Sequence, residues 1–170
     1  MPTIRTLHTL ILAAFAALPC QAQIEKTEAP TKGTFYVSVD DAATIFINGK
    51  EFYKAGVNES RSPEGELKAG DRVVVHLRND SSAKRFMLVF VSTDGKTTVS
   101  FRNSDFKIVP DIGVTDFTPE QLKKWTKSAK QMRGKNLLPV KSSSDWVWGD
   151  LDKCILASTI TPQMFSQKQR

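Results

Sequence analysis

The amino-acid sequence predicts an all-β fold, an antiparallel β-sandwich with one inserted amphipathic helix. Segments in which hydrophobic residues recur at every second position are typical of half-buried strands, and residues 72–78 form such a segment. Asn48-Gly49 and Asp94-Gly95 stand between strand-like segments and favour tight hairpin turns. Short strands separated by turn signals at fairly even spacing indicate two packed antiparallel sheets.

The clearest local pattern is a hairpin formed by residues 43–47 and 50–53. Between them stand Asn48 and Gly49, which tolerate the positive φ angles that both central residues of a type I′ turn require. The strand at residues 72–78 should place one face of alternate residues in the core and leave the other face in water or against a ligand.

The remaining strands follow in chain order. Phe35, Val37 and Val39 alternate with less hydrophobic residues and mark the first strand. Residues 55–70 are rich in polar residues and glycine, so we expect a long loop that forms a rim of the domain. Four further strands are expected at residues 86–91, 97–101, 106–109 and 153–159.

A helix is predicted near residues 119–132. Thr118 is a suitable N-cap, Gln121 completes a capping box, and Gly134 marks the end. Trp125 belongs to a narrow apolar stripe, and the lysines of this segment face mainly outward. We interpret the basic face as solvated, with anionic polysaccharide or lipid head groups as alternatives. Nucleic acid is not expected, because the aromatic residues do not interleave with the basic ones.

Residues 1–22 have the features of a signal peptide. Arg5 supplies a positive charge, residues 10–18 form an apolar segment, and a cleavage site follows Ala22. Cys20 raises the alternative of a lipid anchor, which the preceding proline disfavours because its φ angle is fixed. We therefore expect export, either to the periplasm or out of the cell. No later segment of the sequence is long and apolar enough for a transmembrane helix.

The rest of the chain is expected to form one domain. Residues 23–32 are polar and aperiodic and should be a flexible leader, residues 33–160 form the sandwich domain, and residues 161–170 form a frayed tail. After cleavage, Cys154 would be the single cysteine, so an internal disulfide is not expected. The 24 Lys and Arg against 18 Asp and Glu are compatible with anionic envelope polymers and equally with ordinary solubility.

The sequence favours a non-catalytic protein. Nucleophilic catalysis places a histidine beside a serine or cysteine, but His76 lies mid-strand among basic residues and Cys154 lies in an apolar strand. One histidine and one cysteine cannot complete a zinc site. No cofactor or metal is expected, although the acids Asp40 and Asp41 leave structural calcium open. The spacing of acidic residues marks no pair for glycoside hydrolysis.

Some residues are candidates for ligand binding. Sugar sites combine an aromatic platform with a few hydrogen-bonding side chains. The candidate platforms are Tyr53, Trp146 and Trp148, and the candidate polar partners are Asn58, Arg61, Arg72 and Arg78. Trp146 and Trp148 point the same way if their segment is extended. The alternative is that both tryptophans close the core.

Residues 40–50 and 67–79 carry a wider pattern. Two acids lead into an Asn-Gly-Lys hairpin, and a Leu-Lys-Ala-Gly turn leads into an alternating strand. In these motifs the chain resembles the galactose-binding-like jelly-roll modules of secreted bacterial glycoside hydrolases and surface proteins. The resemblance covers most of residues 35–159. It implies a jelly-roll sandwich that binds glycans without catalysis or packs against a partner.

We therefore expect an exported, non-catalytic carbohydrate-binding or adhesion accessory domain, with a glycan or envelope polysaccharide as its ligand. An envelope scaffold or assembly protein that docks on a protein partner is the alternative. A small glycan-active hydrolase is the third interpretation.

Overall fold

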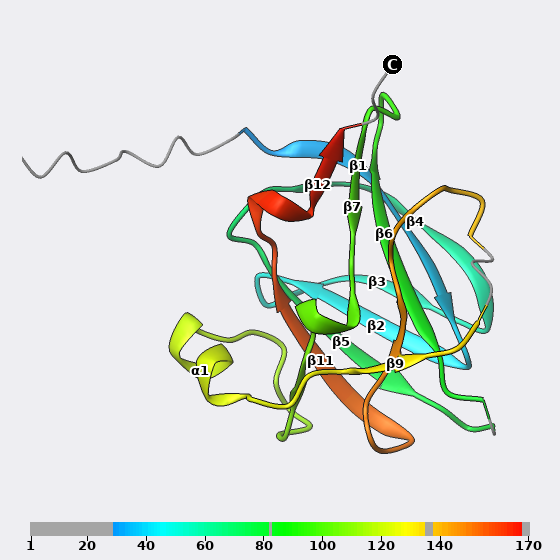
Figure 1. The fold of residues 1–170 in the computed structure, drawn as a ribbon, viewed down its shortest axis with the longest axis vertical. Helices are drawn as coiled ribbons and strands as arrows, with labels where there is room; N and C mark the ends of the chain where they lie inside the picture. The colour runs from blue at the N-terminus through cyan, green and yellow to red at the C-terminus, as the bar shows by residue number, and fades with distance from the viewer. Residues whose placement is uncertain (1–28, 82, 135–137, 168–170) are drawn as a thin grey trace, which may run out of the picture.

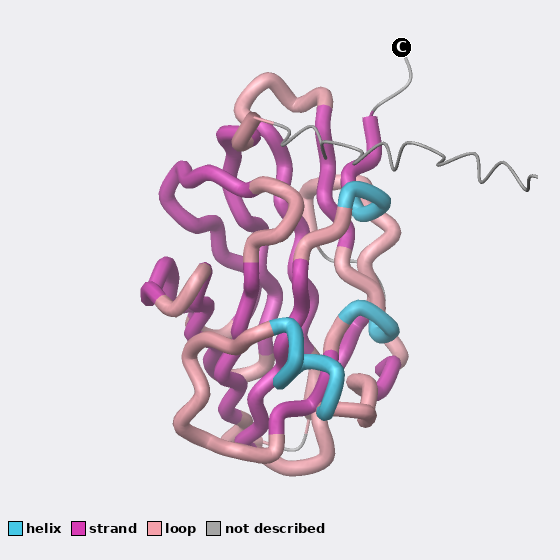
Figure 2. Tube along the Cα trace, turned by 90° about the vertical axis from the view of Figure 1, so that its left-hand side faces the viewer, coloured by secondary structure: helices cyan, strands magenta, loops and turns pink. Residues whose placement is uncertain are grey.

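The computed structural model describes residues 29–81, 83–134 and 138–167, and it shows two antiparallel β-sheets. The long strands lie in two layers, and loops connect them at both ends (Figures 1 and 2). Helices are short and lie outside the layers. The predicted all-β class with two antiparallel sheets is confirmed.

The first sheet has seven strands, in the order β12-β7-β6-β1-β4, with β10 paired to β6 and β9 paired to β10. Their bounds are β1 Thr31–Val39, β4 Asn58–Leu67, β6 Phe86–Ser92, β7 Thr97–Ser100, β9 Lys130–Met132, β10 Trp146–Trp148 and β12 Phe165–Gln167. The strand predicted at residues 86–91 is β6. Its side chains are buried on both faces of the sheet, because Phe86 points into the space between the sheets while Met87 packs on the outer face.

The second sheet has five strands, in the order β3-β2-β5-β11-β8. Their bounds are β2 Ala42–Ile47, β3 Lys50–Ala55, β5 Arg72–Arg78, β8 Lys107–Val109 and β11 Lys153–Thr159. The predicted hairpin is β2-β3, and Asn48 and Gly49 at its turn have φ angles of 49° and 81°. The Asn48 side chain donates a hydrogen bond to Asp71 Oδ1 (2.9 Å) and accepts one from the backbone N–H of Arg72 (2.9 Å). These bonds fix the turn to the neighbouring loop.

The main hydrophobic core lies between the two sheets. Val73, Val75 and Leu77 of β5 point into it, as their alternation predicts. The rings of Phe35 and Phe90 meet edge to face, with centroids 5.1 Å apart. Burial of these side chains is the main favourable contribution to folding, at about 1.5–3 kcal/mol for each large apolar residue.

Each sheet also carries a smaller hydrophobic cluster on its outer face. On the first sheet, Met87 and Trp146 belong to this cluster. On the second sheet, residues 110–126, here called the covering segment, lie over the outer face, and Phe117 packs against Val74 and its neighbours. The outer faces of the sheets are therefore partly covered, and solvent reaches only part of them.

The helix predicted near residues 119–132 is correct in its start and wrong in its length. The helix α1 spans Pro119–Lys124, and Thr118 Oγ1 accepts a hydrogen bond from the Gln121 N–H, as the capping box predicts. Trp125 already has an extended backbone, with φ −85° and ψ 93°. Figure 1 shows α1 at one side of the second sheet.

The helix ends early because strand pairing takes over the backbone hydrogen bonds that follow it. The Ile108 N–H donates to Lys127 O (2.7 Å), and the Ala129 N–H donates to Phe106 O (3.0 Å). The chain then enters β9, which pairs with β10 of the first sheet. This segment runs from the edge of one sheet to the other.

Three further boundaries differ from the predictions. The loop expected at residues 55–70 contains β4, which pairs with β1. The tail expected to be frayed at residues 161–170 contains a 3-10 turn, η2 Pro162–Met164, and β12, which pairs with β7. β1 begins at Thr31, inside the expected leader at residues 23–32. In each case a strand edge was available, and main-chain pairing with it outweighed the polar composition of the segment.

The predicted signal peptide and its lipid-anchor alternative fall in residues 1–28, outside the described residues. The structure holds another short 3-10 turn, η1 Asn103–Asp105. Among the described residues, no helix has the length and hydrophobicity needed to cross a membrane.

Candidate functional site

In the part of the chain that the structure describes, a concave surface with largely apolar walls lies on the outer face of the second sheet. It consists of two adjoining hollows, of about 390 and 490 Å³, which share Ile112, Lys153, Cys154 and Ile155. We call the two hollows together the β11 groove. His76 and Arg78 line the first hollow, and Lys124, Trp125, Lys127, Asp150 and Leu151 line the second.

The groove exists because the covering segment leaves one end of the sheet open. Arg72 holds this segment in place, donating hydrogen bonds from Nε and Nη2 to the two carboxylate oxygens of Asp116 (2.7 and 2.9 Å). The His76 Nε2 atom lies 2.6 Å from Val114 O. The segment turns at residues 110–113 before it reaches these anchors, so the outer face beyond His76 stays accessible.

The walls of the groove are largely apolar. Trp125 is half-buried, and its ring packs edge to face against Phe117 with centroids 5.6 Å apart. Ile112 and Leu151 are 82% and 69% exposed, although they are large hydrophobic residues. Two such side chains beside one concave surface are unusual for a surface that contacts only water, because exposed apolar area is costly.

Basic side chains surround these walls. Arg78, Lys124, Lys127 and Lys153 line the groove. Asp150 is the acidic residue among the described residues that line the groove. Its carboxylate forms ion pairs with Lys127, which also lines the groove, and with Lys130 outside it (2.9 Å). Hydrogen bonds from these lysines hold the pKa of Asp150 below its ordinary value. The groove therefore has a cationic rim.

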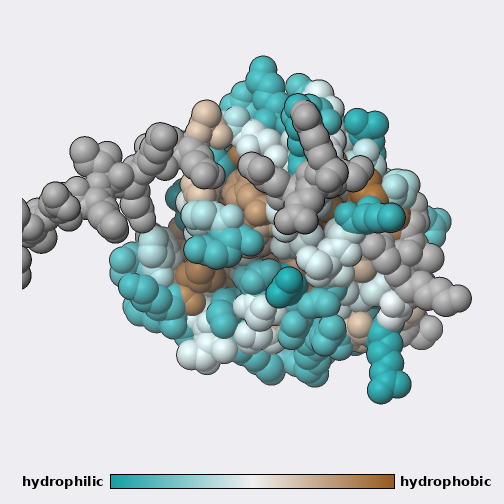
Figure 3. All heavy atoms as spheres, turned by 45° about the horizontal axis from the view of Figure 1, so that its top comes forward, coloured by the Kyte–Doolittle hydropathy of each residue, from teal (hydrophilic) through white to brown (hydrophobic). Residues whose placement is uncertain are grey.

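The opposite end of the sandwich differs in character. It carries the β6-β7 turn, and Figure 3 shows it covered mainly by hydrophilic side chains, with hydrophobic atoms visible only in separate areas between them. The hollow lined by Thr31, Ser92 and Asp94 lies at this end and has a volume of about 290 Å³. It lacks the combination of apolar walls and basic rim found in the β11 groove.

The structure corrects the interpretation of Trp146 and Trp148 as stacking platforms. Their side chains are only 4% and 0% exposed. They also do not point the same way, since Trp146 packs on the outer face of the first sheet and Trp148 packs between the sheets. β10 spans only Trp146–Trp148, and the chain then continues to β11 in the second sheet. The alternative interpretation, that both tryptophans are buried, is confirmed, with Trp148 in the main core and Trp146 in the smaller cluster on the outer face of the first sheet.

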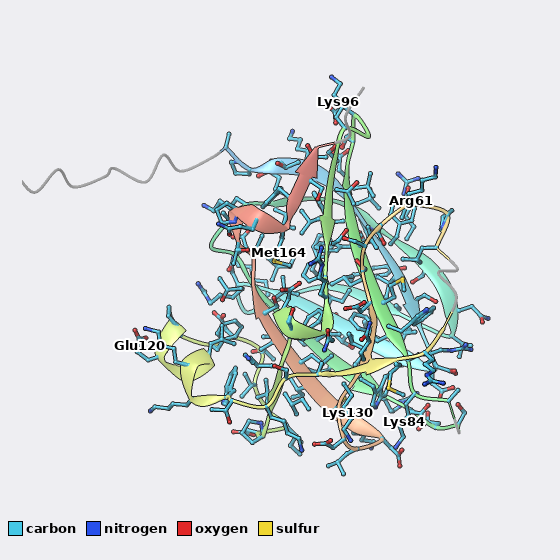
Figure 4. The ribbon with its side chains drawn as sticks, viewed as in Figure 1. Arg61, Lys84, Lys96, Glu120, Lys130 and Met164 are labelled. Atoms are coloured by element: carbon cyan, nitrogen blue, oxygen red, sulfur yellow. The ribbon has the colours of Figure 1, made fainter. Side chains whose placement is uncertain are left out.

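The other candidate residues do not come together in one site. Tyr53 lies on the edge strand β3, half-buried against the main core. Asn58 and Arg61 lie on β4 of the other sheet, and the Arg61 guanidinium stands over the Tyr36 ring at 5.5 Å. Figure 4 shows Arg61 far from Lys130 and Lys84, which lie at the groove end of the molecule.

The two arginines of β5 have different positions. Arg72 is engaged by Asp116, and this carboxylate raises the pKa of the guanidinium through a hydrogen bond. Arg78 lines the β11 groove, where it also pairs with the exposed Asp80 (2.9 Å). Of the candidate residues, Arg78 is the one that the structure places in the groove.

The acids considered for calcium have protein partners. Asp40 pairs with Arg85 (3.3 Å), and Asp41 accepts a hydrogen bond from the Asp80 N–H (2.5 Å). Within residues 29–81, 83–134 and 138–167, no group of three or more His, Cys, Asp or Glu side chains is arranged to hold a metal ion. These acids instead stabilise the turns after β1 and β5, as short acidic side chains commonly do.

Cys154 and His76 show no arrangement for nucleophilic catalysis in the described part of the chain. Burial raises the pKa of the Cys154 thiol to about 11, which keeps it protonated at neutral pH. His76 contacts Val114 O and the Phe46 ring, with ring centroids 4.8 Å apart. Both residues touch the groove but belong mainly to the packing of the sheet beneath it.

Ile112 and Leu151 were not among the candidate residues that the sequence indicated, and Trp125 was expected in a longer helix. One local signal was present at Ile112, an apolar residue between Asp111 and Gly113 in a segment whose other features indicate a turn. No local pattern indicated that these residues would face the same groove.

No protein-family model, curated protein or solved structure matches this chain.

Proposed function

We propose that this protein is an exported, non-catalytic module that binds a glycan in the β11 groove. Its aromatic contact is Trp125, in place of the tryptophans of β10. Arg78, Lys127 and Lys153 supply hydrogen bonds to hydroxyl groups. Export rests on the signal-peptide features of residues 1–22.

The observation that carries this proposal is the composition of the groove. Sugar rings have apolar C–H faces and a polar edge, so proteins bind them with apolar or aromatic surfaces flanked by hydrogen-bonding groups. Trp125, Ile112 and Leu151 supply such a surface, and the cationic side chains flank it. The hollows are open at the surface and fall within the usual size of small-ligand sites, roughly 300–1,000 Å³.

Two further observations support the proposal. Glycoside hydrolysis uses a pair of carboxyl groups. Asp150 is the acid among the described residues that line the groove, and its lowered pKa does not suit a general acid at neutral pH. The resemblance of residues 40–50 and 67–79 to galactose-binding-like jelly-roll modules also favours binding without catalysis.

A glycan array probed with the purified protein tests the proposal. Ile112→Ser should weaken binding to the glycans that give signals by roughly tenfold, because it removes an exposed apolar contact without affecting the core. Val57→Ser is the matched control, since Val57 is 58% exposed and does not line the groove. Trp125→Ala should have the larger effect, and circular dichroism checks that it folds. An array without signals for the wild-type protein would refute glycan binding.

A protein partner is the second candidate, favoured by the exposure of Ile112 and Leu151. Large exposed apolar side chains are common at the centre of protein interfaces. A stoichiometric complex that survives purification and is lost with Leu151→Ser, in a protein that binds no glycan, would establish this function instead.

A further inference from the structure

We infer that the glycan bound in the β11 groove is anionic, a polysaccharide that carries carboxylate or sulfate groups. This inference rests on the proposed function and names its ligand class. It comes from the balance of charge around the groove and from which of these charges already have partners.

Four cationic side chains line the groove, Arg78, Lys124, Lys127 and Lys153. Against them stands the carboxylate of Asp150. A concave surface lined mainly by one sign of charge raises the local concentration of ligands of the opposite sign. A neutral sugar would gain nothing from this excess of positive charge.

The existing ion pairs divide these cations into two groups. Lys127 is paired with Asp150, and Arg78 is paired with Asp80. In the described part of the chain, the side-chain amines of Lys124 and Lys153 form no hydrogen bond or ion pair. Both of these lysines are exposed, and both line the larger hollow. An anionic group of a ligand in this hollow therefore meets two ammonium groups that need not give up a protein partner.

The apolar walls argue for a sugar chain over a small free anion. Ile112 lies where the two hollows join, and Trp125 and Leu151 line the larger one. Inorganic phosphate or sulfate would leave these side chains in water, whereas an acidic sugar places its ring on them and its charged group near Lys124 or Lys153. The two hollows in succession give room for more than one sugar residue of a chain.

The affinity should depend on salt. The cationic groups of the rim are exposed, so ions screen them over a Debye length of about 10 Å at 0.1 M salt. We expect binding of an acidic polysaccharide to weaken by roughly tenfold between about 20 and 200 mM sodium chloride. Binding of a neutral glycan would change little over the same range.

Paired polymers that differ only in charge provide the direct test. The probes are polygalacturonate with its fully methyl-esterified form, and dextran sulfate with dextran, each titrated into the purified full chain by isothermal calorimetry. We expect at least one acidic polymer to bind at least tenfold more tightly than its neutral partner. The first pair reports on carboxylate and the second on sulfate.

A double variant separates the groove from the overall charge of the protein. Lys124→Gln with Lys153→Gln should weaken binding of the acidic polymer by roughly 5- to 30-fold, as expected for the loss of two exposed ionic contacts. Lys32→Gln with Lys68→Gln is the matched control, because both residues are exposed, lie outside the groove and change the net charge equally. The control should stay within twofold of the wild type.

The outcomes distinguish this inference from the proposed function. Equal binding of acidic and neutral polymers, with a loss in Ile112→Ser, would overturn the anionic preference and keep glycan binding. An equal loss in the groove variant and the control would show diffuse attraction and overturn the inference as well. No binding of any of these polymers, together with an array without signals, would refute the proposed function itself.

Discussion

Replacing Trp148 with alanine tests both the sandwich core and the position of the β10-β11 turn. The Trp148 side chain is fully buried between the sheets, and its Nε1–H donates a hydrogen bond to Leu151 O (2.9 Å). Leu151 is one of the exposed side chains of the β11 groove. Trp148 therefore contributes to folding through its burial and to the shape of the proposed binding site through its hydrogen bond to Leu151.

The expected loss follows from the buried area. A buried tryptophan removes roughly 150–250 Å² from water. At roughly 25 cal/mol per Å², this corresponds to about 4–6 kcal/mol. Alanine retains a small part of it, so we expect Trp148→Ala to lower the free energy of unfolding by about 3–5 kcal/mol. Trp148→Phe keeps a ring in the core but loses the hydrogen bond, and it should cost about 2 kcal/mol.

Equilibrium urea denaturation, followed by far-ultraviolet circular dichroism, measures these losses. The phenylalanine variant keeps the test informative if the alanine variant does not fold, since typical domains have only about 5–15 kcal/mol of stability. A loss below about 1 kcal/mol in both variants would refute the burial of Trp148. Loss of glycan binding at unchanged stability would restore the interpretation of this tryptophan as a surface platform.

The remaining predictions concern a close contact, an ion pair and a thiol. Gly33→Ala should lower the free energy of unfolding by about 1–3 kcal/mol, because the added Cβ would lie 2.3 Å from a backbone oxygen of β6. Gly56→Ala is the control in the same denaturation assay and should leave stability unchanged, because a Cβ at Gly56 meets no atom within 4 Å. Asp116→Asn should lower the free energy of unfolding by about 0.5–1 kcal/mol at pH 7, because it removes a partly exposed ion pair with Arg72. The hydrogen bond from this arginine lowers the pKa of Asp116, so its stabilisation is complete above the pKa of the unfolded chain and disappears as the pH falls through the folded-state pKa. Denaturation of both proteins from pH 7 to about 2 checks this, and a difference that persists at the lowest pH would contradict it. Burial raises the pKa of the Cys154 thiol to about 11, so it should react with iodoacetamide at pH 8 roughly 100-fold more slowly than an ordinary thiol until urea unfolds the protein, as measured by peptide mapping. Equal rates in the folded and unfolded protein would contradict its burial.

Local sequence patterns predicted those elements whose partners are close in the chain. The β2-β3 hairpin follows from Asn48 and Gly49, because few other residues adopt the backbone angles of that turn. The start of α1 follows from Thr118 and Gln121, whose reciprocal hydrogen bonds are made within one turn. The alternation of residues 72–78 predicted which side chains of β5 are buried between the sheets.

Elements that depend on a distant strand could not be predicted in the same way. The sequence of β4 contains Ser60, Pro63 and Gly65, and composition alone favours a loop. It forms a strand because the edge of β1 accepts its backbone hydrogen bonds. The second half of the predicted helix is extended for the same reason, since β8 and β10 offer strand pairing there.

The residues of the candidate site also divide into those that a local pattern could predict and those that depend on distant contacts. Arg78 was identified because the sequence places it on the exposed face of β5. Trp146 and Trp148 were chosen for their residue type, but whether a tryptophan is exposed depends on what packs over it. Both are covered by segments that no local pattern connects with them.

By itself, the sequence of this protein determined the turns, the helix cap and the two-residue period of its strands, since these arise from backbone angles and hydrogen bonds between near neighbours. Only the tertiary structure decided which apolar side chains remain in contact with water. Ile112 and Trp125 come from the two ends of the covering segment and Leu151 from the β10-β11 turn, and the three side chains line one groove because the covering segment leaves the end of β11 open. Exposure is set by contacts between residues far apart in the chain, which a period or a motif does not encode.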